Sequence, residues 1–96
     1  MAEIKLELDD LDTGAINLYD DDQKVGTLLI NIEDDKLMAF HTEVAKDSRG
    51  KGYAKKMFNK MVTYVKEHRL KVVPLCPYIE SQFKRNPDKY RDIWAT

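Results

Sequence analysis

The stretch Arg49-Gly50-Lys51-Gly52-Tyr53-Ala54 separates a strand-like run that ends at Val44 from a strongly amphipathic segment that begins near Tyr53. Glycine adopts the backbone conformations of a tight turn more easily than any other residue. A turn here would expose backbone N–H groups next to the first turn of a helix, where unsatisfied donors and the helix dipole favour an anion. The stretch therefore predicts a phosphate or pyrophosphate site at a strand-to-helix turn.

The residues after the turn predict a helix, a short strand and a last helical segment. Apolar side chains recur at helical spacing after Ala54, at positions 57, 58, 61, 62 and 65, while lysines fill much of the remainder. The apolar run 72–75 is typical of a short buried strand whose length two prolines limit. A helical segment is expected over 79–84, and a final turn over 90–94 would return Trp94 to the core.

Four strand-like segments precede the turn. Ile4, Leu6 and Leu8 alternate with charged residues, as in a half-buried strand. Further strands are expected over 15–19, 25–32 and 37–44, because clusters of aspartate separate these runs as turns would. The order of elements predicts an α+β fold, in which an antiparallel four-stranded meander is followed by a right-handed strand-helix-strand crossover.

Length and charge limit the classes of function. The 96 residues are expected to form one domain that spans residues 1–96. The chain has 16 Lys and Arg against 17 Asp and Glu, and the formal net charge of −1 does not favour nucleic acid or an anionic membrane. No apolar leader and no apolar run of roughly 20 residues is present. We therefore expect a cytoplasmic protein that binds neither nucleic acid nor membrane. Because periodicity separates no exposed apolar stripe from the core, we also expect a monomer.

The spacing of the glycines excludes two common phosphate loops and fits a third. A P-loop needs Gly-Lys-Ser/Thr and a Rossmann turn needs Gly-x-Gly-x-x-Gly, and neither occurs. The six residues match Arg/Gln-x-x-Gly-x-Gly/Ala, with Val44 five residues before Arg49, and so the chain resembles the GNAT acetyltransferases. His41-Thr42-Glu43-Val44 and residues 72–78 are similar to one small stand-alone GNAT subfamily, which extends the resemblance over about residues 37–90.

The resemblance implies a minimal GNAT fold with acetyl-CoA as its co-substrate. The implied sheet has five mostly antiparallel strands, with a parallel pair that splays apart near Val44 and Leu75 around the pyrophosphate-binding helix, and a C-terminal helix follows. The pantetheine arm would enter the splayed gap. The residues that the resemblance implies as cofactor contacts are Val44, Ala45, Arg49, Gly50, Lys51, Gly52, Tyr53 and Ala54. The implied reaction moves an acetyl group to an amine.

Acetyl transfer requires a base for the acceptor ammonium and a donor for the oxyanion. His41 and Glu43 lie two residues apart on one predicted strand, so they share a face unless a bulge intervenes, and either could act as the base. A structural histidine and a solvated glutamate are equally consistent with this pattern. The resemblance places the oxyanion donor among the backbone N–H groups of Glu43, Val44 and Ala45.

The acid that protonates the leaving thiolate is not where many GNAT enzymes carry it. The corresponding tyrosine position holds Phe83, which cannot donate a proton, so Cys76, Tyr78 or Tyr90 would have to replace it. Cys76 opens the last predicted helix, whose N-terminus favours a thiolate. It could protonate the thiolate of coenzyme A or accept the acetyl group itself. The alternative for Cys76 is a small buried apolar residue.

The acceptor and the metal content are constrained less directly. The aspartate clusters lie at expected turns without the spacing of a calcium loop, so no metal is expected. Only a turn connects the first two strands, where many GNAT enzymes carry two helices, and this leaves the acceptor side open to a small amine or to a peptide or protein amine. A non-catalytic acyl-CoA-binding module is the alternative function. An interaction protein that has lost the ligand is a third and would bind no coenzyme A.

Overall fold

The alternating first half of the chain folds into consecutive strands, and the second half supplies the helices. The computed structural model describes residues 2–95. Its elements in chain order are β1 (Ala2–Leu8), β2 (Thr13–Asp20), β3 (Gln23–Glu33), β4 (Lys36–Val44), the 3-10 helix η1 (Lys46–Ser48), α1 (Tyr53–Glu67), β5 (Lys71–Pro74), α2 (Pro77–Arg85), α3 (Pro87–Tyr90) and the 3-10 helix η2 (Arg91–Ile93).

The strands form one five-stranded sheet whose spatial order is the sequence order β1-β2-β3-β4-β5. The first four pair antiparallel, and β5 pairs parallel to β4 after the crossover through α1. The parallel pairing ends at Ala39 and Pro74, whereas β4 continues to Val44. The predicted α+β fold is therefore confirmed. Residues 40–44 of β4 do not pair with β5, and the region between them and the chain after Pro74 is here called the gap.

Helix α1 packs across β2, β3 and β4 and carries the centre of the core. Its side chains Met57, Phe58, Met61 and Val65 are fully buried, at the spacing that the sequence predicts. Burial of one such side chain contributes about 1.5–3 kcal/mol. Gly26 of β3 lets the helix approach closely, because a Cβ atom there would lie 3.0 Å from the Met57 side chain.

The C-terminal segment closes the core around an aromatic cluster. Helix α2 starts at Pro77, two residues before the predicted start, because proline is well suited to the first turn of a helix. Phe83 lies 5.8 Å from Phe58 and 5.4 Å from Trp94 between ring centroids. The N–H of Ala95 donates to the Val72 carbonyl at 2.9 Å, which ties the end of the chain to β5. The predicted return of Trp94 to the core is thus confirmed.

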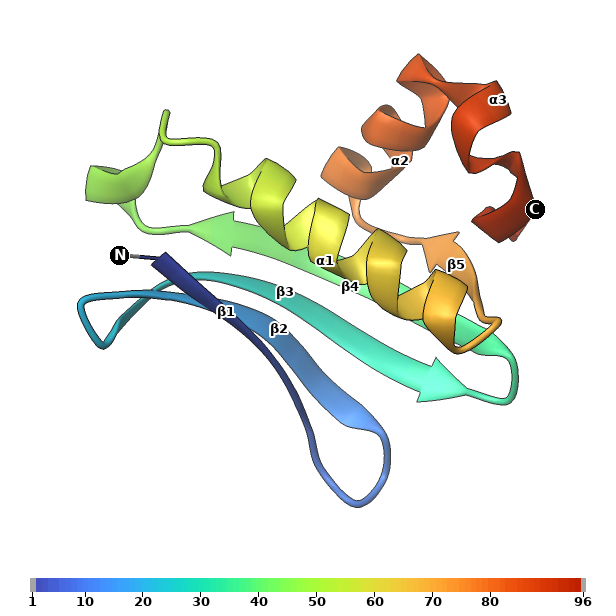
Figure 1. Cartoon of the computed structure of the whole chain (residues 1–96), viewed down its shortest axis with the longest axis horizontal. Helices are drawn as coiled ribbons and strands as arrows, with labels where there is room; N and C mark the ends of the chain where they lie inside the picture. The colour runs from blue at the N-terminus through green and yellow to red at the C-terminus, as the bar shows by residue number, and fades with distance from the viewer. Residues whose placement is uncertain (1, 96) are drawn as a thin grey trace.

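The helices lie on one side of the sheet (Figure 1). The opposite side, here called the open face, carries alternate residues of the strands, and over residues 2–95 no helix packs on it. The longest helix within this range, α1, has 15 residues, and none is long and apolar enough to span a membrane.

Candidate functional site

The turn that the sequence singles out forms the entrance to α1. Gly50 and Gly52 have φ angles of +85° and +77°, in the left-handed region that other residues adopt only with strain. Gly52 is the N-cap of α1, and the first helical bond runs from the Lys56 N–H to its carbonyl at 3.1 Å. By helix geometry the N–H groups of Tyr53, Ala54 and Lys55 have no acceptor within α1. The turn thus directs unsatisfied donors outward.

The surface of this turn is hollowed. A hollow of 260 Å³, here called the loop hollow, is lined by Val44, Ser48, Arg49, Gly50, Gly52, Tyr53, Ala54, Lys55 and Tyr78. Seven of these residues are predicted site residues, so folding brings the loop, the end of β4 and the start of α2 together. A Cβ atom on either glycine would meet nothing within 4 Å, which leaves this backbone open to a ligand. Lys51 belongs to the loop but does not line the hollow.

The side chain of Tyr53 anchors the loop. It is buried, and its hydroxyl donates to Asp20 Oδ2 at 3.0 Å, which joins the start of α1 to the β2–β3 turn. This hydrogen bond, with a smaller contribution from burial, raises the pKa of Tyr53 above that of a free tyrosine. Because the hydroxyl is bonded to Asp20, only the backbone of Tyr53 is available for the predicted contact with a cofactor.

Tyr78 and Lys55 approach the loop hollow from α2 and α1. Burial is the main cause that raises the pKa of the Tyr78 hydroxyl, so the group is protonated at neutral pH and can donate a proton. Lys55 donates to Gln82 Oε1 at 2.7 Å, and its ammonium lies 4.9 Å from the centre of the Phe58 ring. Lys55 is not among the residues that the sequence predicts for the site. A cation in the first turn of a helix is disfavoured by the helix dipole. This unfavourable position of Lys55 is the feature of the sequence that could have indicated a functional role.

Cys76 lies below the gap between β4 and β5. Its thiol is buried, with 2% of the residue exposed, and Sγ lies 3.2 Å from Oγ1 of Thr42 on β4. The N–H of Cys76 donates to the Ala39 carbonyl at 2.8 Å, and Cys76 is the N-cap of α2. It does not line the loop hollow. The partner Thr42 was missed because the sequence does not reveal which face of β4 meets Cys76.

A β-bulge in β4 decides how the predicted bases are oriented. Leu29 pairs with His41 and Ile30 pairs with Ala39, so Phe40 is the extra residue. The bulge precedes His41 and Glu43, which therefore share the open face, and both are exposed. Thr42 takes the other face, where it meets Cys76. The sequence prediction that His41 and Glu43 share a face agrees with this register.

Backbone hydrogen bonds distinguish the three candidate oxyanion donors. The Ala45 N–H donates to the Val25 carbonyl at 2.7 Å and is therefore occupied. Because N–H groups alternate in direction along a strand, that of Glu43 also points to β3, whereas that of Val44 points toward the gap. Nε of Arg49 donates to the Val44 carbonyl at 3.4 Å, which places the arginine over the end of β4.

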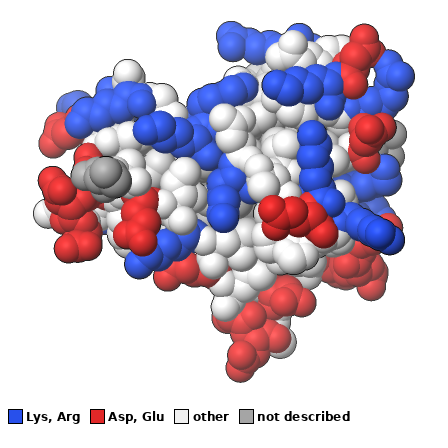
Figure 2. Space-filling model, in the orientation of Figure 1, with Lys and Arg blue, Asp and Glu red and all other residues white. Residues whose placement is uncertain are grey.

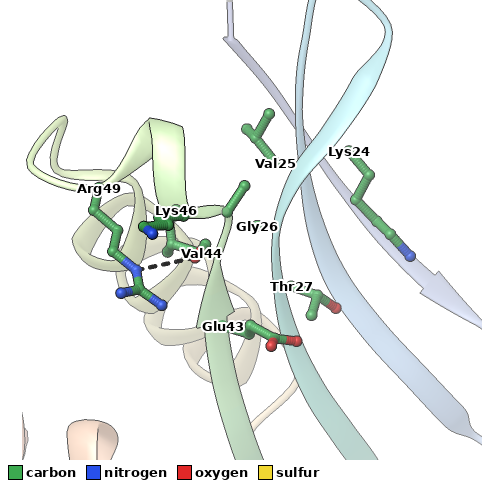
Figure 3. Close-up of a pocket in the computed structure, with 9 residues that line it drawn as sticks. Lys24, Val25, Gly26, Thr27, Glu43, Val44, Lys46 and Arg49 are labelled. Atoms are coloured by element: carbon green, nitrogen blue, oxygen red, sulfur yellow. Dashed lines mark hydrogen bonds between the residues drawn. The ribbon is translucent and has the colours of Figure 1, made fainter.

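A second hollow, here called the strand hollow, lies at the end of the β3–β4 pair (Figure 3). Its volume is 270 Å³, and it is lined by Lys24, Val25, Gly26, Thr27, Glu43, Val44, Ala45, Lys46 and Arg49. It shares Val44 and Arg49 with the loop hollow. Figure 3 shows Arg49 on one side of β4 and Glu43 with Thr27 on the other. His41 and Cys76 line neither hollow.

The described residues do not gather a metal site. Within residues 2–95, no group of three or more His, Cys, Asp or Glu side chains is arranged to hold a metal ion. The aspartates instead form turns, and Asp12, Asp21, Asp22 and Asp34 have positive φ angles. Aspartate tolerates this region better than most residues, which explains the clusters without a ligand.

Sequence comparison identifies a family. Residues 15–93 match the family model described as GCN5-related N-acetyl-transferase. No curated protein sequence matches the chain. The matched range covers the strands from Ala15 onward, the glycine loop, α1, β5 and α2.

Solved structures share the fold. The ribosomal-protein-alanine N-acetyltransferase of Brucella melitensis biovar Abortus 2308 is 22% identical, with a TM-score of 0.66 over 91% of this chain and 64% of its own. The paia N-acetyltransferase of Thermoplasma acidophilum, solved in complex with coenzyme A, is 16% identical, with a TM-score of 0.60 over 80% of this chain and 52% of its own. The ribosomal-protein-S18-alanine N-acetyltransferase of Escherichia coli is 10% identical, with a TM-score of 0.60 over 64% and 40%. The chain thus spans less than two thirds of the length of each.

Proposed function

The chain belongs to the GCN5-related N-acetyl-transferase family, and on this basis we propose that it transfers an acetyl group from acetyl-CoA to an amine. The observation that carries the proposal is the loop hollow. Two glycines with positive φ open it, the N-terminus of α1 faces it, and Val44 and Tyr78 line it beyond Ala39 and Pro74, where the pairing of β4 with β5 ends. The coenzyme A in the Thermoplasma structure supports the same co-substrate here.

The residues of the loop hollow fit the pyrophosphate of acetyl-CoA. The N–H groups from Arg49 to Ala54 would hold it, and Arg49 and Lys55 would supply charge-assisted contacts. The open space around both glycines supports close approach of a ligand to the backbone. Acetyl-CoA supplies the activated thioester, and the protein has to place that group in the gap beside β4.

Val44 and the exposed pair on β4 are assigned to the attack of the amine. His41 or Glu43 takes a proton from the acceptor ammonium, directly or through one water, because both are exposed on the open face of β4. The neutral amine then attacks the acetyl carbonyl. The Val44 N–H, which points away from β3, donates to the oxygen on which charge develops.

Tyr78 is assigned to the departure of the thiolate. As the tetrahedral intermediate collapses, the carbon–sulfur bond breaks and the Tyr78 hydroxyl gives its proton to the thiolate of coenzyme A. Tyr78 lines the loop hollow and its pKa is raised, so it holds its proton at neutral pH. Phe83 at the usual acid position packs in the aromatic core instead.

Cys76 offers a second path, which its contact with Thr42 favours. In this path the sulfur of Cys76 attacks the acetyl carbonyl, the carbon–sulfur bond to coenzyme A breaks, and the proton of the Cys76 thiol passes to the departing coenzyme A thiol. The acceptor amine later takes the acetyl group from the Cys76 sulfur and restores the thiol. The burial of Cys76 requires the start of α2 to open first. Intact-mass analysis after incubation with acetyl-CoA distinguishes the two paths. Added acetyl mass that Cys76→Ser removes supports the second path.

A titration tests the proposal as a whole. The protein is titrated with acetyl-CoA and with desulfo-coenzyme A while the backbone amide shifts of residues 49–54 are followed. We expect both ligands to shift these amides, and an amine added with acetyl-CoA to become acetylated. Binding without transfer to any amine would favour an acyl-CoA-binding module. Absence of binding would exclude both functions.

A further inference from the structure

Lys55 lies at a position in α1 where the helix itself disfavours a cation. It is the third residue of the helix, close to the unsatisfied N–H groups of the first turn, whose partial positive charge repels an ammonium. The first turn contains no acidic residue that would offset this repulsion. Lys55 nevertheless lines the loop hollow beside Gly52 and Ala54. Positive charge is therefore concentrated at this one place on the surface.

The two groups that hold the Lys55 ammonium are both neutral. Nζ donates to Oε1 of Gln82 on α2 at 2.7 Å, and it lies 4.9 Å from the centre of the Phe58 ring. An amide oxygen and an aromatic face fix an ammonium in place without cancelling its charge. Gln82 is buried, so packing confines its side chain. The cation is thus held in position but not neutralised.

Two other cations of the helical segments pair with carboxylates instead. Lys84 lies 3.4 Å from Glu80 on α2, and Arg91 pairs with Asp88 near the end of the chain. In each pair a carboxylate offsets the positive charge. Lys and Arg gather over the helices, so this part of the surface attracts anions (Figure 2). Lys55 differs from the two paired cations because it keeps its charge where it lines the loop hollow.

We propose that Gln82 is a positioning residue, which holds the Lys55 ammonium ready for the phosphate of acetyl-CoA that joins the pantetheine arm. The inference rests on the proposed binding of acetyl-CoA. Lys55 reaches toward α2, which follows the gap where the arm would lie, and Tyr78 of the same helix lines the hollow. Of the two phosphates in the pyrophosphate, the one next to the arm is therefore nearer. An ammonium has three N–H donors, so Lys55 can serve Gln82 and a phosphate together.

A purely structural link between α1 and α2 is the alternative role of this hydrogen bond, and one substitution distinguishes the two roles. Gln82→Glu keeps an acceptor oxygen at the same reach and adds a negative charge. A carboxylate bonds an ammonium more strongly than an amide does, so a structural link would be kept or strengthened. In the proposed role the same carboxylate would cancel the charge of Lys55 and repel the phosphate. Gln82→Glu should therefore bind acetyl-CoA more weakly.

Titration of the variants measures this effect. Affinity for acetyl-CoA is obtained from the backbone amide shifts of residues 49–54, and the free energy of unfolding from urea denaturation. We expect Gln82→Glu to lower the affinity about tenfold while it remains at least as stable as Gln82→Met. Gln82→Met, which only releases the ammonium, should lower the affinity about threefold. Lys55→Met should lower it about tenfold, and Gln82→Met should add nothing in the Lys55→Met background, because Gln82 acts through Lys55.

Two further lysine variants serve as controls. Lys56→Met removes the neighbouring cation, which lies 5.4 Å from the centre of the Tyr53 ring and does not line the loop hollow. The affinity of Lys56→Met should stay within about twofold of the unmodified protein. Lys55→Arg keeps a positive charge and N–H donors at the hollow and should retain most of the affinity. Because Lys55 and Lys56 are exposed, these substitutions are expected to leave the fold intact.

Shortened ligands identify the phosphate that Lys55 contacts. The loss of affinity in Lys55→Met should persist with acetyl-CoA that lacks the ribose phosphate and with S-acetyl-phosphopantetheine, because both keep the phosphate next to the arm. S-acetylpantetheine has no phosphate, so it should bind Lys55→Met and the unmodified protein equally. The amide shifts of residues 49–54 report these weaker affinities without any need for acetyl transfer.

The outcomes separate this inference from the proposed function. Unchanged or higher affinity in Gln82→Glu, or an equal loss in Lys56→Met, would overturn the role of Gln82 while acetyl-CoA binding still stands. An effect of Lys55→Met that requires the ribose phosphate would overturn the assignment to the arm. Absence of any amide shift when acetyl-CoA is added to the unmodified protein would instead contradict the proposed function and, with it, this inference.

Discussion

The two sides of β4 present different kinds of surface. On the helix side, the loop hollow is formed largely by backbone, with glycines that permit left-handed turns and a helix start that supplies donors. On the open face, side chains of β3 and β4 such as Leu29, His41 and Glu43 are exposed. The helix side is therefore shaped by backbone conformation and the open face by side chains. Substitutions should separate the two, because a change on one side leaves the other intact.

The largest effect is expected from Gly52→Glu. The side chain strains a residue with a φ angle of +77° and places a negative charge where the pyrophosphate would lie. We expect the affinity for acetyl-CoA to fall at least about hundredfold by calorimetry. Asn59→Glu, which adds the same charge to the exposed side of α1, should keep normal affinity. If the backbone amide shifts of β3 are unchanged in Gly52→Glu, the separation of the two sides holds.

Tyr78→Phe tests the helix side of β4 at the start of α2, where Tyr78 lines the loop hollow. We expect kcat to fall about a hundredfold while the affinity for acetyl-CoA is unchanged, because only proton donation is lost. Tyr64→Phe, at a partly buried position of α1 that does not line the loop hollow, serves as the control. An undiminished kcat in Tyr78→Phe would remove Tyr78 from the mechanism.

The pH dependence of kcat distinguishes Tyr78 from Cys76. The pKa of Tyr78 is raised above the ordinary value of 10.0, so its protonated form persists and the rate should not decline on the alkaline side below pH 10.0. A decline below pH 10.0 that Cys76→Ser removes would instead indicate that the cysteine donates the proton.

The smallest effect is expected from Thr42→Val, which removes the hydroxyl that contacts Cys76 across the gap. Loss of one such hydrogen bond costs about 1 kcal/mol in the free energy of unfolding. Urea denaturation measures this loss, and Thr42→Ser should retain most of the stability. A much larger loss would mean that the contact between Thr42 and Cys76 is part of the core rather than of the site.

The sequence predicted most of what depends on local patterns. Aspartate turns and apolar alternation located the strands, and the spacing of Met57, Phe58 and Met61 located α1. The glycine loop was recognised because left-handed turns require particular residue types. The contact of Thr42 with Cys76 could not be predicted, because it depends on a bulge at Phe40 and on where β5 leaves the sheet. Non-local geometry of this kind leaves no pattern in a single sequence.

The order of the strands has a consequence for how the site assembles during folding. Because β1 to β4 follow one another in sequence, their hairpins close short loops, and such elements form within about microseconds. The four-residue pairing of β5 with β4 closes a much longer loop through α1, so we expect it to form last. The same pairing borders the gap, and in hydrogen exchange its amides should open before those of the meander. The site would then be the last part of the molecule to fold and the first to open.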